Sequence, residues 1–459
     1  MAGAHTPRHL FFPIPSAFNF IKMKRLFLGA TLITLFFSSC SLFHRNEMIT
    51  DSKDYRQYLV PRSEKTQLKK IDTEISFWKR RFNATPDDLV SRNKIASLLT
   101  QRFGYSGNVQ EVHQADSLYQ LVNQLNRKNS SGTFRSLAAN CITQHKFQQA
   151  QLYIDSALQL GDDKYLTVLM EFDVAMELGN KYRARKALNS LVDKNAFEYI
   201  IREAKYKDHA EGDLDAAIEL MEDALEKVKE LNNQAVSLWT LSNLGDMYGH
   251  ANRYKESYRC YLDVLAKDPE YYHALKGIAW LAFSKDGNTA DARYIIQYLQ
   301  QQHPLPDYDL MLFKIASFEN NKQNAAQHIN NFISKVSAKA YGDMYNKYLF
   351  GLQADELNNY AVALSIAEKE VLHRPTGEAF SWLAWAYCKS GQNEKALQTV
   401  RYYVQNSCYE PDAMYYVGKI YLANGDTKNA RKYLTQAAES KYELGPGISS
   451  DINKTLKEL

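Results

Sequence analysis

Cysteine is scarce in this sequence, and the residue types that catalysis or metal binding would need are not grouped. The 459 residues include 5 cysteines, and no two of them form a CxxC pair or another metal-ligand spacing. The 11 histidines are scattered, without a pair at metal-ligand spacing on one predicted helix. The motifs HExxH, GxGxxG, GxxxxGKS/T and GxSxG are also absent. We therefore predict that the protein is not an enzyme and has no catalytic residues, no metal site and no cofactor.

An excess of basic charge is lacking as well. The chain has 56 Lys and Arg residues against 52 Asp and Glu residues. Four of the basic residues, and no acidic residue, precede position 40, so that residues 40–459 carry 52 of each sign. Binding to nucleic acid requires concentrated Lys and Arg. A neutral chain without a basic run therefore argues against nucleic acid as a partner.

The N-terminal apolar run, Leu26–Phe37, is too short to cross a bilayer, which takes about 20 apolar residues. It follows the basic start Met23-Lys24-Arg25 and has the length of the apolar region of an export signal. This signal is complete without residues 1–22, so we expect Met23 to be the true start. Residues 1–39 are therefore predicted to be an export signal.

The end of this run, Phe37-Ser38-Ser39-Cys40, resembles the lipobox of bacterial lipoproteins. The resemblance implies cleavage before Cys40 and lipidation of that residue, with residues 40–62 as the lipid-anchored tether. Phe37 departs from the pattern, because leucine is usual there. The alternative is an ordinary signal peptide with an incidental cysteine. Ser41 stands where enteric-type lipoproteins retained at the inner membrane have Asp, which favours the outer membrane, on its periplasmic or surface face.

The remainder of the chain contains internal repeats with a period of 34 residues, and repeats indicate an array. Large apolar residues recur at positions 4, 7, 11 and 24 of each unit, and small residues at positions 8, 20 and 27. The unit that begins at Pro411 has Met414, Val417, Gly418, Tyr421, Ala430, Leu434 and Ala437 at these positions. The unit that begins at Gly377 has Phe380, Leu383, Ala384, Tyr387, Ala396, Val400 and Tyr403.

This pattern resembles the tetratricopeptide repeat, a helix–turn–helix unit. The resemblance implies an all-α fold, a right-handed α-solenoid of about ten stacked repeats over residues 89–444. A lone helix is expected within residues 63–88, and a turn with a capping helix within residues 445–459. Small residues at positions 8 and 20 let the two helices of a unit approach closely, so Gly418 should lie at a close contact. Glycines such as Gly179 and Gly425 fall where the first helix must stop, at a left-handed turn.

The first helices of the units should line a concave groove, which is the usual binding surface of such arrays. Their outward positions carry aromatic residues, and clustered exposed aromatics mark recognition surfaces. The predicted binding residues are Tyr199, Tyr206, Trp239, Trp280, Tyr345, Tyr348, Trp385 and Tyr415. The alternative is that neighbouring repeats or the terminal helix cover these rings.

Two smaller groups of residues complete the interpretation. His145, at a turn, and His209 and His250, near the ends of first helices, are interpreted as solvated or capping residues. Four cysteines follow Cys40, namely Cys141, Cys260, Cys388 and Cys408. We predict free thiols, because the pattern separates the last two along one helical pair, whereas a disulfide needs Cα atoms within about 7 Å.

The function predicted from these features is a non-catalytic scaffold lipoprotein of the bacterial cell envelope that binds a protein or peptide in its groove. One alternative is a surface lipoprotein that captures glycans or nutrients, because aromatic side chains stack on sugars. Another is a regulatory subunit of an envelope enzyme. The sequence does not identify the partner or the oligomeric state.

Overall fold

The helices of this chain begin and end at local signals in the sequence. Asp88 precedes helix α3 (Leu89–Ser106), and its carboxylate accepts hydrogen bonds from the backbone N–H groups of Val90 and Ser91. The side chain of Thr376 caps α19 (Gly377–Lys389) in the same way, through the N–H of Ala379. Such caps satisfy the donors that a helix start leaves without partners.

The computed structural model describes residues 48–61, 65–85, 88–231 and 233–459, and every regular element within them is a helix. Ten consecutive helical pairs make up most of the chain. The first five pairs are α3 with α4 (Val109–Leu125), α5 (Ser131–Thr143) with α6 (Phe147–Leu160), α7 (Lys164–Glu177) with α8 (Lys181–Asn189), α9 (Phe197–Tyr206) with α10 (Leu214–Leu231), and α11 (Gln234–His250) with α12 (Tyr254–Lys267). The other five are α13 (Tyr272–Ser284) with α14 (Thr289–Gln302), α15 (Asp307–Phe318) with α16 (Lys322–Val336), α17 (Asn346–Gly351) with α18 (Tyr360–His373), α19 with α20 (Asn393–Thr399), and α21 (Pro411–Ala423) with α22 (Thr427–Glu439). The predicted all-α solenoid of stacked helix–turn–helix units is confirmed.

Shorter elements extend or flank these pairs. Single π-helical turns lengthen α9, α17 and α20; they are η2 (Lys207–Glu211), η4 (Leu352–Glu356) and η5 (Val400–Val404). The flanking elements are α1 (Ser52–Tyr55), η1 (Arg56–Tyr58), α2 (Thr66–Ala84), η3 (Lys339–Tyr341) and α23 (Lys441–Glu458). None of the described helices is long and apolar enough to cross a membrane.

The turn inside each pair has a residue in the left-handed conformation. Glycine occupies it in six units, at Gly107, Gly179, Gly212, Gly287, Gly391 and Gly425, with φ between 67° and 79°. Asparagine or histidine takes the same place in four others, at His145, Asn252, Asn320 and Asn358, with φ between 53° and 60°. Because glycine and asparagine adopt this conformation at low cost, they suit the turn position at which the first helix ends.

The close contact predicted within each pair is present at Gly418. A Cβ atom added there would lie 2.7 Å from Cγ of Leu434 on α22. Gly245 occupies the same position in α11, and its added Cβ would lie 2.7 Å from the ring of Tyr261 on α12. Both small residues therefore allow the second helix to pack directly on the backbone of the first.

The N-terminal part of the described chain lies against repeats that come more than 200 residues later. The carboxylate of Asp286 accepts hydrogen bonds from the backbone N–H groups of Ile49 and Thr50, both at 2.9 Å. Glu270 accepts the N–H of Thr66 at 2.8 Å, at the start of α2. The described part of the predicted tether, residues 48–61, thus lies on α12–α14. The helix expected within residues 63–88 is α2, which packs on α3.

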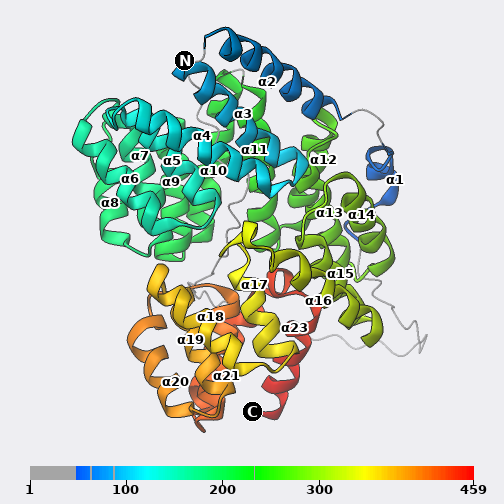
Figure 1. The fold of residues 1–459 in the computed structure, drawn as a ribbon. Helices are drawn as coiled ribbons and strands as arrows, with labels where there is room; N and C mark the ends of the chain where they lie inside the picture. Colours follow the sequence, from blue (N-terminus) through cyan, green and yellow to red (C-terminus); the bar gives the residue numbers. More distant parts are fainter. Residues whose placement is uncertain (1–47, 62–64, 86–87, 232) are drawn as a thin grey trace, which may run out of the picture.

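The stack coils tightly enough for its second turn to pack on its first (Figure 1). Nζ of Lys65 donates to the carbonyl of Gln302, His113 bonds the carbonyl of Ala340, and Gln148 bonds the carbonyl of Leu372. The partners in these contacts are 237, 227 and 224 residues apart. This nearly constant offset corresponds to about seven 34-residue repeats per superhelical turn. We call the line of contacts between the two turns the seam.

The C-terminal helix turns back into the concave side of the superhelix. Helix α23 begins at Lys441, earlier than the predicted start of the capping region at residue 445, and it is kinked at Gly445, where φ is 76° and ψ is 173°. It packs against α11, α13, α15, α21 and α22. In Figure 1, α23 (red) runs down to the C-terminus in the lower part of the molecule, near α21.

Candidate functional site

The concave face is lined by the first helices of the pairs, and ion pairs join several of these helices to the next one. Arg202 on α9 reaches Asp173 on α7 at 2.6 Å, and Lys205 reaches Glu177 at 2.9 Å. His273 and Asp246 form a similar contact between α13 and α11, at 2.8 Å. Most charges of this lining are therefore paired within the protein, and such partly buried pairs hold adjacent repeats in register.

The densest charged cluster lies where α17, α19 and α21 meet. Carboxylate oxygens of Glu378, Glu410 and Asp412 lie within 4.8 Å of one another, a spacing at which they could hold a metal ion. Nζ of Lys347 lies 2.8 Å from Glu378 and 3.1 Å from Asp412, and Arg374 lies 2.8 Å from Glu378. These two cations provide the positive charge that the carboxylates require, which explains the cluster as an ion-pair network.

The pKa values within this cluster differ between the carboxyl groups. Burial by itself would raise the pKa of Glu378, but Lys347 and Arg374 outweigh burial and lower it to about 2. Burial, reinforced by the charge of Glu378, raises the pKa of Glu410 well above its usual range. Glu378 is therefore ionised at pH 7, whereas Glu410 binds its proton more tightly than an exposed glutamate does.

Polar and charged groups also cross the seam. Nζ of Lys181 on α8 donates to the carbonyls of Ala210, at 2.9 Å, and of Ser407 on the second turn, at 3.1 Å. His209 lies 3.6 Å from Glu410 on the other turn and 3.8 Å from Asp208. The interpretation of His209 as a solvated or capping residue is thus wrong, because the closure of the superhelix encloses it.

Three of the eight predicted binding aromatics are buried, and each donates a hydrogen bond to a nearby carboxylate. Tyr199 bonds Glu203 at 3.2 Å, Tyr345 bonds Asp307 at 2.7 Å, and Nε1 of Trp385 bonds Asp355 at 2.9 Å. Their exposed fractions are 8%, 8% and 6%. In this conformation they support the lining and present little surface to a partner.

The other five predicted side chains are half-buried, namely Tyr206, Trp239, Trp280, Tyr348 and Tyr415. The guanidinium of Arg185 lies over the ring of Tyr206, at 3.8 Å from the centroid. The hydroxyl of Tyr415 donates to Asp451 of α23 at 2.9 Å. These five rings do not form one open groove, because the C-terminal helix covers part of the surface between them.

The part of the concave face around Trp280 is filled by Tyr442 of α23. The Tyr442 side chain is buried, and its carbonyl accepts hydrogen bonds from Nε1 of Trp280 at 2.9 Å and Oγ of Ser284 at 2.8 Å. Its ring lies against Gly249, where an added Cβ would come within 2.5 Å of it. The ring of Tyr254 lies 5.5 Å away between centroids. The sequence-based alternative, in which the terminal helix covers the rings, therefore holds at Trp280.

The residue after Tyr442, Glu443, is the ionic partner of His250. Nδ1 of His250 lies 2.9 Å from the carboxylate of Glu443. Burial by itself would lower the pKa of His250, but the charge and hydrogen bond of Glu443 outweigh burial and raise it. His250 is thus an ion-pairing residue and not a solvated one. His145 lies in its predicted turn, but burial, and then the charge of Arg374, lower its pKa to about 4.

The sequence interpretation did not include Tyr442 or Glu443 in the site. One signal pointed to them: Gly249, a small residue at the outward end of a first helix, marks a place where another part of the chain comes close. The partner of that glycine could not be read from periodicity, because Tyr442 lies outside the repeats. The four cysteines of the described chain are free, as predicted. Cys40 lies outside the described residues.

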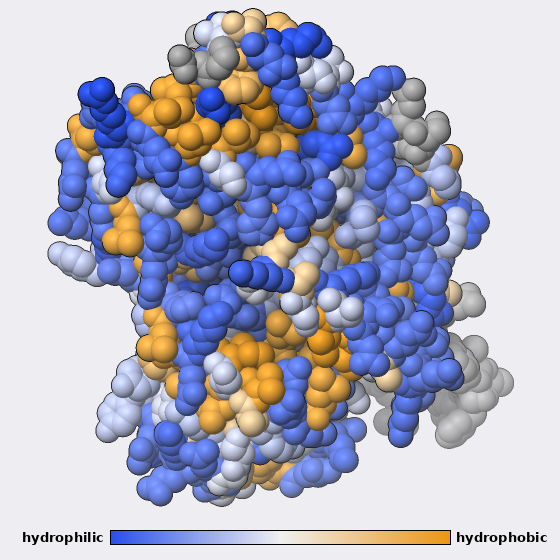
Figure 2. Space-filling view, viewed as in Figure 1, coloured by the Kyte–Doolittle hydropathy of each residue, from blue (hydrophilic) through white to orange (hydrophobic). Residues whose placement is uncertain are grey.

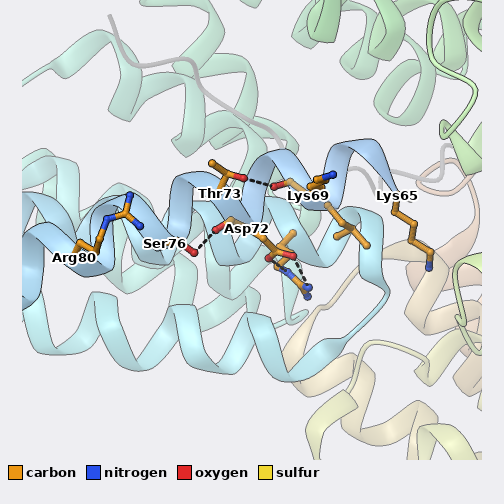
Figure 3. Close-up of a pocket in the computed structure, with 8 residues that line it drawn as sticks. Lys65, Lys69, Asp72, Thr73, Ser76 and Arg80 are labelled. Carbon is orange, nitrogen blue, oxygen red and sulfur yellow. Dashed lines mark hydrogen bonds and ion pairs between the residues drawn. The ribbon is translucent and has the colours of Figure 1, made fainter. Parts of the chain in front are cut away.

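Two shallow depressions, each of about 500 Å³, lie on the surface of the described chain. The first follows α2 and α3 and is lined mainly by polar and charged side chains, including Lys65, Asp72 and Arg80 (Figure 3). Asp72 is paired with Arg102 at 2.7 Å, and the hydroxyl of Ser76 bonds a carbonyl of its own helix. The second lies on α23. In Figure 2 the viewed face is mainly hydrophilic, with hydrophobic side chains gathered in the lower half, around α17, α18 and α23, and at the upper left, around α4 and α7.

Comparisons with known proteins agree with this architecture. A family model described as the tetratricopeptide repeat matches residues 383–447 and so confirms the predicted resemblance for this part of the chain. No curated protein is significantly similar to the chain in sequence.

Solved structures that resemble the chain do so only distantly. The type IV pilus biogenesis factor PilW is 17% identical, with a TM-score of 0.36 over 45% of this chain and 94% of that one. A tetratricopeptide repeat protein from Parabacteroides merdae is 19% identical, with a TM-score of 0.34 over 58% and 98%. Yeast Tom70 is 12% identical, with a TM-score of 0.34 over 89% and 96%.

Proposed function

We propose that this protein is a non-catalytic scaffold of the bacterial cell envelope that binds a protein or peptide partner on its concave face. The observation that carries the proposal is the set of half-buried aromatic side chains on first helices of the repeats, namely Tyr206, Trp239, Trp280, Tyr348 and Tyr415. Large amphipathic rings contribute much of the binding energy at protein interfaces, because they bury a wide area at a small cost in side-chain entropy.

The charge of the concave lining supports a peptide over a strongly charged ligand. Lys205, Arg202 and His273 are each paired with a carboxylate of the preceding repeat. A phosphate-rich or polyanionic partner would have to break these pairs and leave the carboxylates without counterions. A partner that offers apolar and aromatic side chains with backbone hydrogen bonds needs no such exchange.

We further propose that a lipid on Cys40 anchors the protein, at the outer membrane. The sequence from Leu26 to Cys40 supports this part of the proposal. Cys40 precedes Ile49 by nine residues, and Ile49 bonds Asp286, between α13 and α14. An anchor at Cys40 would therefore hold the side of the superhelix that carries α12–α14 close to the membrane.

Substitution of concave aromatics tests the binding role. We expect Tyr206→Ala, Trp239→Ala and Tyr348→Ala, made together, to reduce partner capture at least tenfold when the full chain is crosslinked in its native cell. The matched control is Tyr182→Ala with Tyr402→Ala, because both rings are 80% exposed on second helices. Equal capture by the two variants, with unchanged helical circular dichroism, would remove the concave face as the binding surface.

Fractionation tests the anchor separately. We expect Cys40→Ser to move the protein from the membrane fraction to the soluble fraction, since acyl chains provide the attachment. Ser39→Ala is the control, because the lipobox accepts small residues before the cysteine. A Cys40→Ser protein that stays with the membranes would contradict the anchor.

A further inference from the structure

The concave face contains a pocket whose present occupant is the chain itself. Its walls are Gly249, Tyr254, Tyr261, Trp280 and Ser284, from α11, α12 and α13, and we call it the tyrosine pocket. We infer that the tyrosine pocket recognises a partner peptide carrying a Tyr-Glu pair, and that residues 441–445 occupy it as an intramolecular competitor. This inference rests on the proposed function and specifies the chemistry of the partner.

The pocket is shaped for an aromatic ring. Gly249 forms its floor, and any larger residue there would place a Cβ within 2.5 Å of the Tyr442 ring. The rings of His250 and Trp280 meet it edge-on, at centroid distances of 5.8 and 6.4 Å. Edge-on contacts of this kind add to the burial of area and fix the orientation of a ring.

The pocket also binds a peptide backbone. Nε1 of Trp280 and Oγ of Ser284 both donate to the carbonyl of Tyr442. In a regular helix this carbonyl would accept the N–H of residue 446, but residue 446 is proline and has no N–H. Gly445 leaves the helical conformation at the same place. The two donors of the pocket therefore hold a carbonyl that helix geometry leaves free, as they would in a non-helical peptide.

A third contact selects acidic character after the aromatic residue. Nδ1 of His250 lies 2.9 Å from the carboxylate of Glu443. Ring, carbonyl and carboxylate are thus recognised by different groups of the protein, all of them on the repeats and none on α22 or α23. A partner with the same three features fits the pocket without any change in the repeats.

The rest of α23 is held by other contacts, so the pocket can be vacated locally. Leu444 and Ile452 pack with Leu434 and Ala437 of α22, and Asp451 pairs with Tyr415 and Lys419. A tethered occupant acts at an effective concentration in the millimolar range, so a partner must compete with it. Removal of the Tyr442 ring should therefore weaken the hold of the site on residues 441–445, while the rest of α23 stays docked.

The test uses the full chain and a fluorescent peptide with the sequence of residues 440–447, SKYELGPG. We expect the Tyr442→Ala protein to bind this peptide at least tenfold more tightly than the wild type by fluorescence anisotropy. Replacement of the peptide tyrosine by alanine should abolish binding, and glutamine in place of its glutamate should weaken it. Gly249→Val in the Tyr442→Ala background should also abolish binding, because valine fills the floor of the pocket.

The inference would be overturned if the Tyr442→Ala protein bound the peptide equally well after Gly249→Val, or after alanine replaced the peptide tyrosine. It would also be overturned if a folded Tyr442→Ala protein did not bind the peptide. A second measurement needs no variant: millimolar peptide should speed hydrogen exchange of residues 441–445 in the wild type, and unchanged exchange counts against the inference. Loss of partner capture in the Tyr206, Trp239 and Tyr348 variant tests the proposed function independently. A scaffold that captures its partner but shows no peptide binding at this pocket would disprove only the present inference.

Discussion

Asp208 is a residue whose burial in the closed superhelix has an electrostatic cost. It is fully buried, and neither of its carboxylate oxygens has a hydrogen-bond partner among the described residues. Burial raises its pKa from 3.8 to about 7, and the charge of Glu410 adds to this while that of His209 opposes it. Because the folded state binds this proton more tightly than the unfolded state does, stability falls as the pH rises between about 4 and 7.

Removal of this charge should stabilise the protein at high pH. We expect Asp208→Asn to raise the free energy of unfolding by about 2 kcal/mol at pH 8, because an amide carries no charge to bury. At pH 4.5 the difference should be small, since the buried carboxyl is then already protonated. Urea unfolding at the two pH values measures this, with the exposed Asp162→Asn as control. An equal effect at both pH values would show that charge is not the cause.

The pair between His250 and Glu443 should respond to pH with the same sign, although the cause is a favourable ion pair and not the burial of a charge. The raised pKa of His250 means that its contribution is present below the ordinary histidine pKa and is lost as the pH rises through the folded value. Glu443, Asp246 and Glu410 all favour the protonated ring. We therefore expect hydrogen exchange of residues 441–445, corrected for intrinsic rates, to be faster at pH 8.5 than at pH 6. His250→Gln should remove this difference.

At the scale of single elements, the repeat pattern predicted helix order and turn positions but not the contacts of each small residue. Gly418 and Gly351 occupy the same position in their repeats. An added Cβ at Gly418 would meet Leu434 at 2.7 Å, whereas at Gly351 there is nothing within 4 Å. The difference arises because α17 is short and continues as a π-helical turn, which changes how α18 packs on it.

The same substitution should therefore have opposite effects at these two glycines. We expect Gly418→Ala to destabilise the protein by about 1–3 kcal/mol through overpacking. Gly351→Ala should stabilise it by about 0.5–1 kcal/mol, because alanine has the higher helix propensity. Chemical denaturation of both variants measures the two shifts. Shifts of the same sign would contradict the packing explanation.

At the scale of the whole molecule, the seam decides which turn glycines tolerate a side chain. Gly179 and Gly425 hold the same turn position, with φ of 70° and 77°. At Gly179 an added Cβ would lie 3.2 Å from Cα of Thr376 on the second turn, and at Gly425 nothing lies within 4 Å. Asn252 and Asn358 show that asparagine adopts this conformation in other repeats of the same chain.

Asparagine at these positions therefore tests the seam with little backbone strain. We expect Gly179→Asn to lower the free energy of unfolding by about 1–3 kcal/mol and to increase the radius of gyration, because the two turns must separate. Gly425→Asn should change the free energy of unfolding by less than about 1 kcal/mol. It should leave the radius of gyration unchanged within the experimental error. Denaturation and small-angle X-ray scattering give the two quantities. An unchanged radius of gyration for Gly179→Asn would mean that contacts near residue 179 rearrange locally and that the two turns do not separate.

The sequence by itself determined the all-α fold, the register of the repeats and the residues that end each first helix. These features depend on contacts within about 34 residues, which periodicity and turn chemistry record directly. The tertiary structure decided the burial of Tyr199, Tyr345 and Trp385 and the occupation of the tyrosine pocket by Tyr442. It also decided the enclosure of Asp208 and His209. These features depend on the superhelical pitch, which sums small rotations over about seven repeats and brings together residues that no local pattern links.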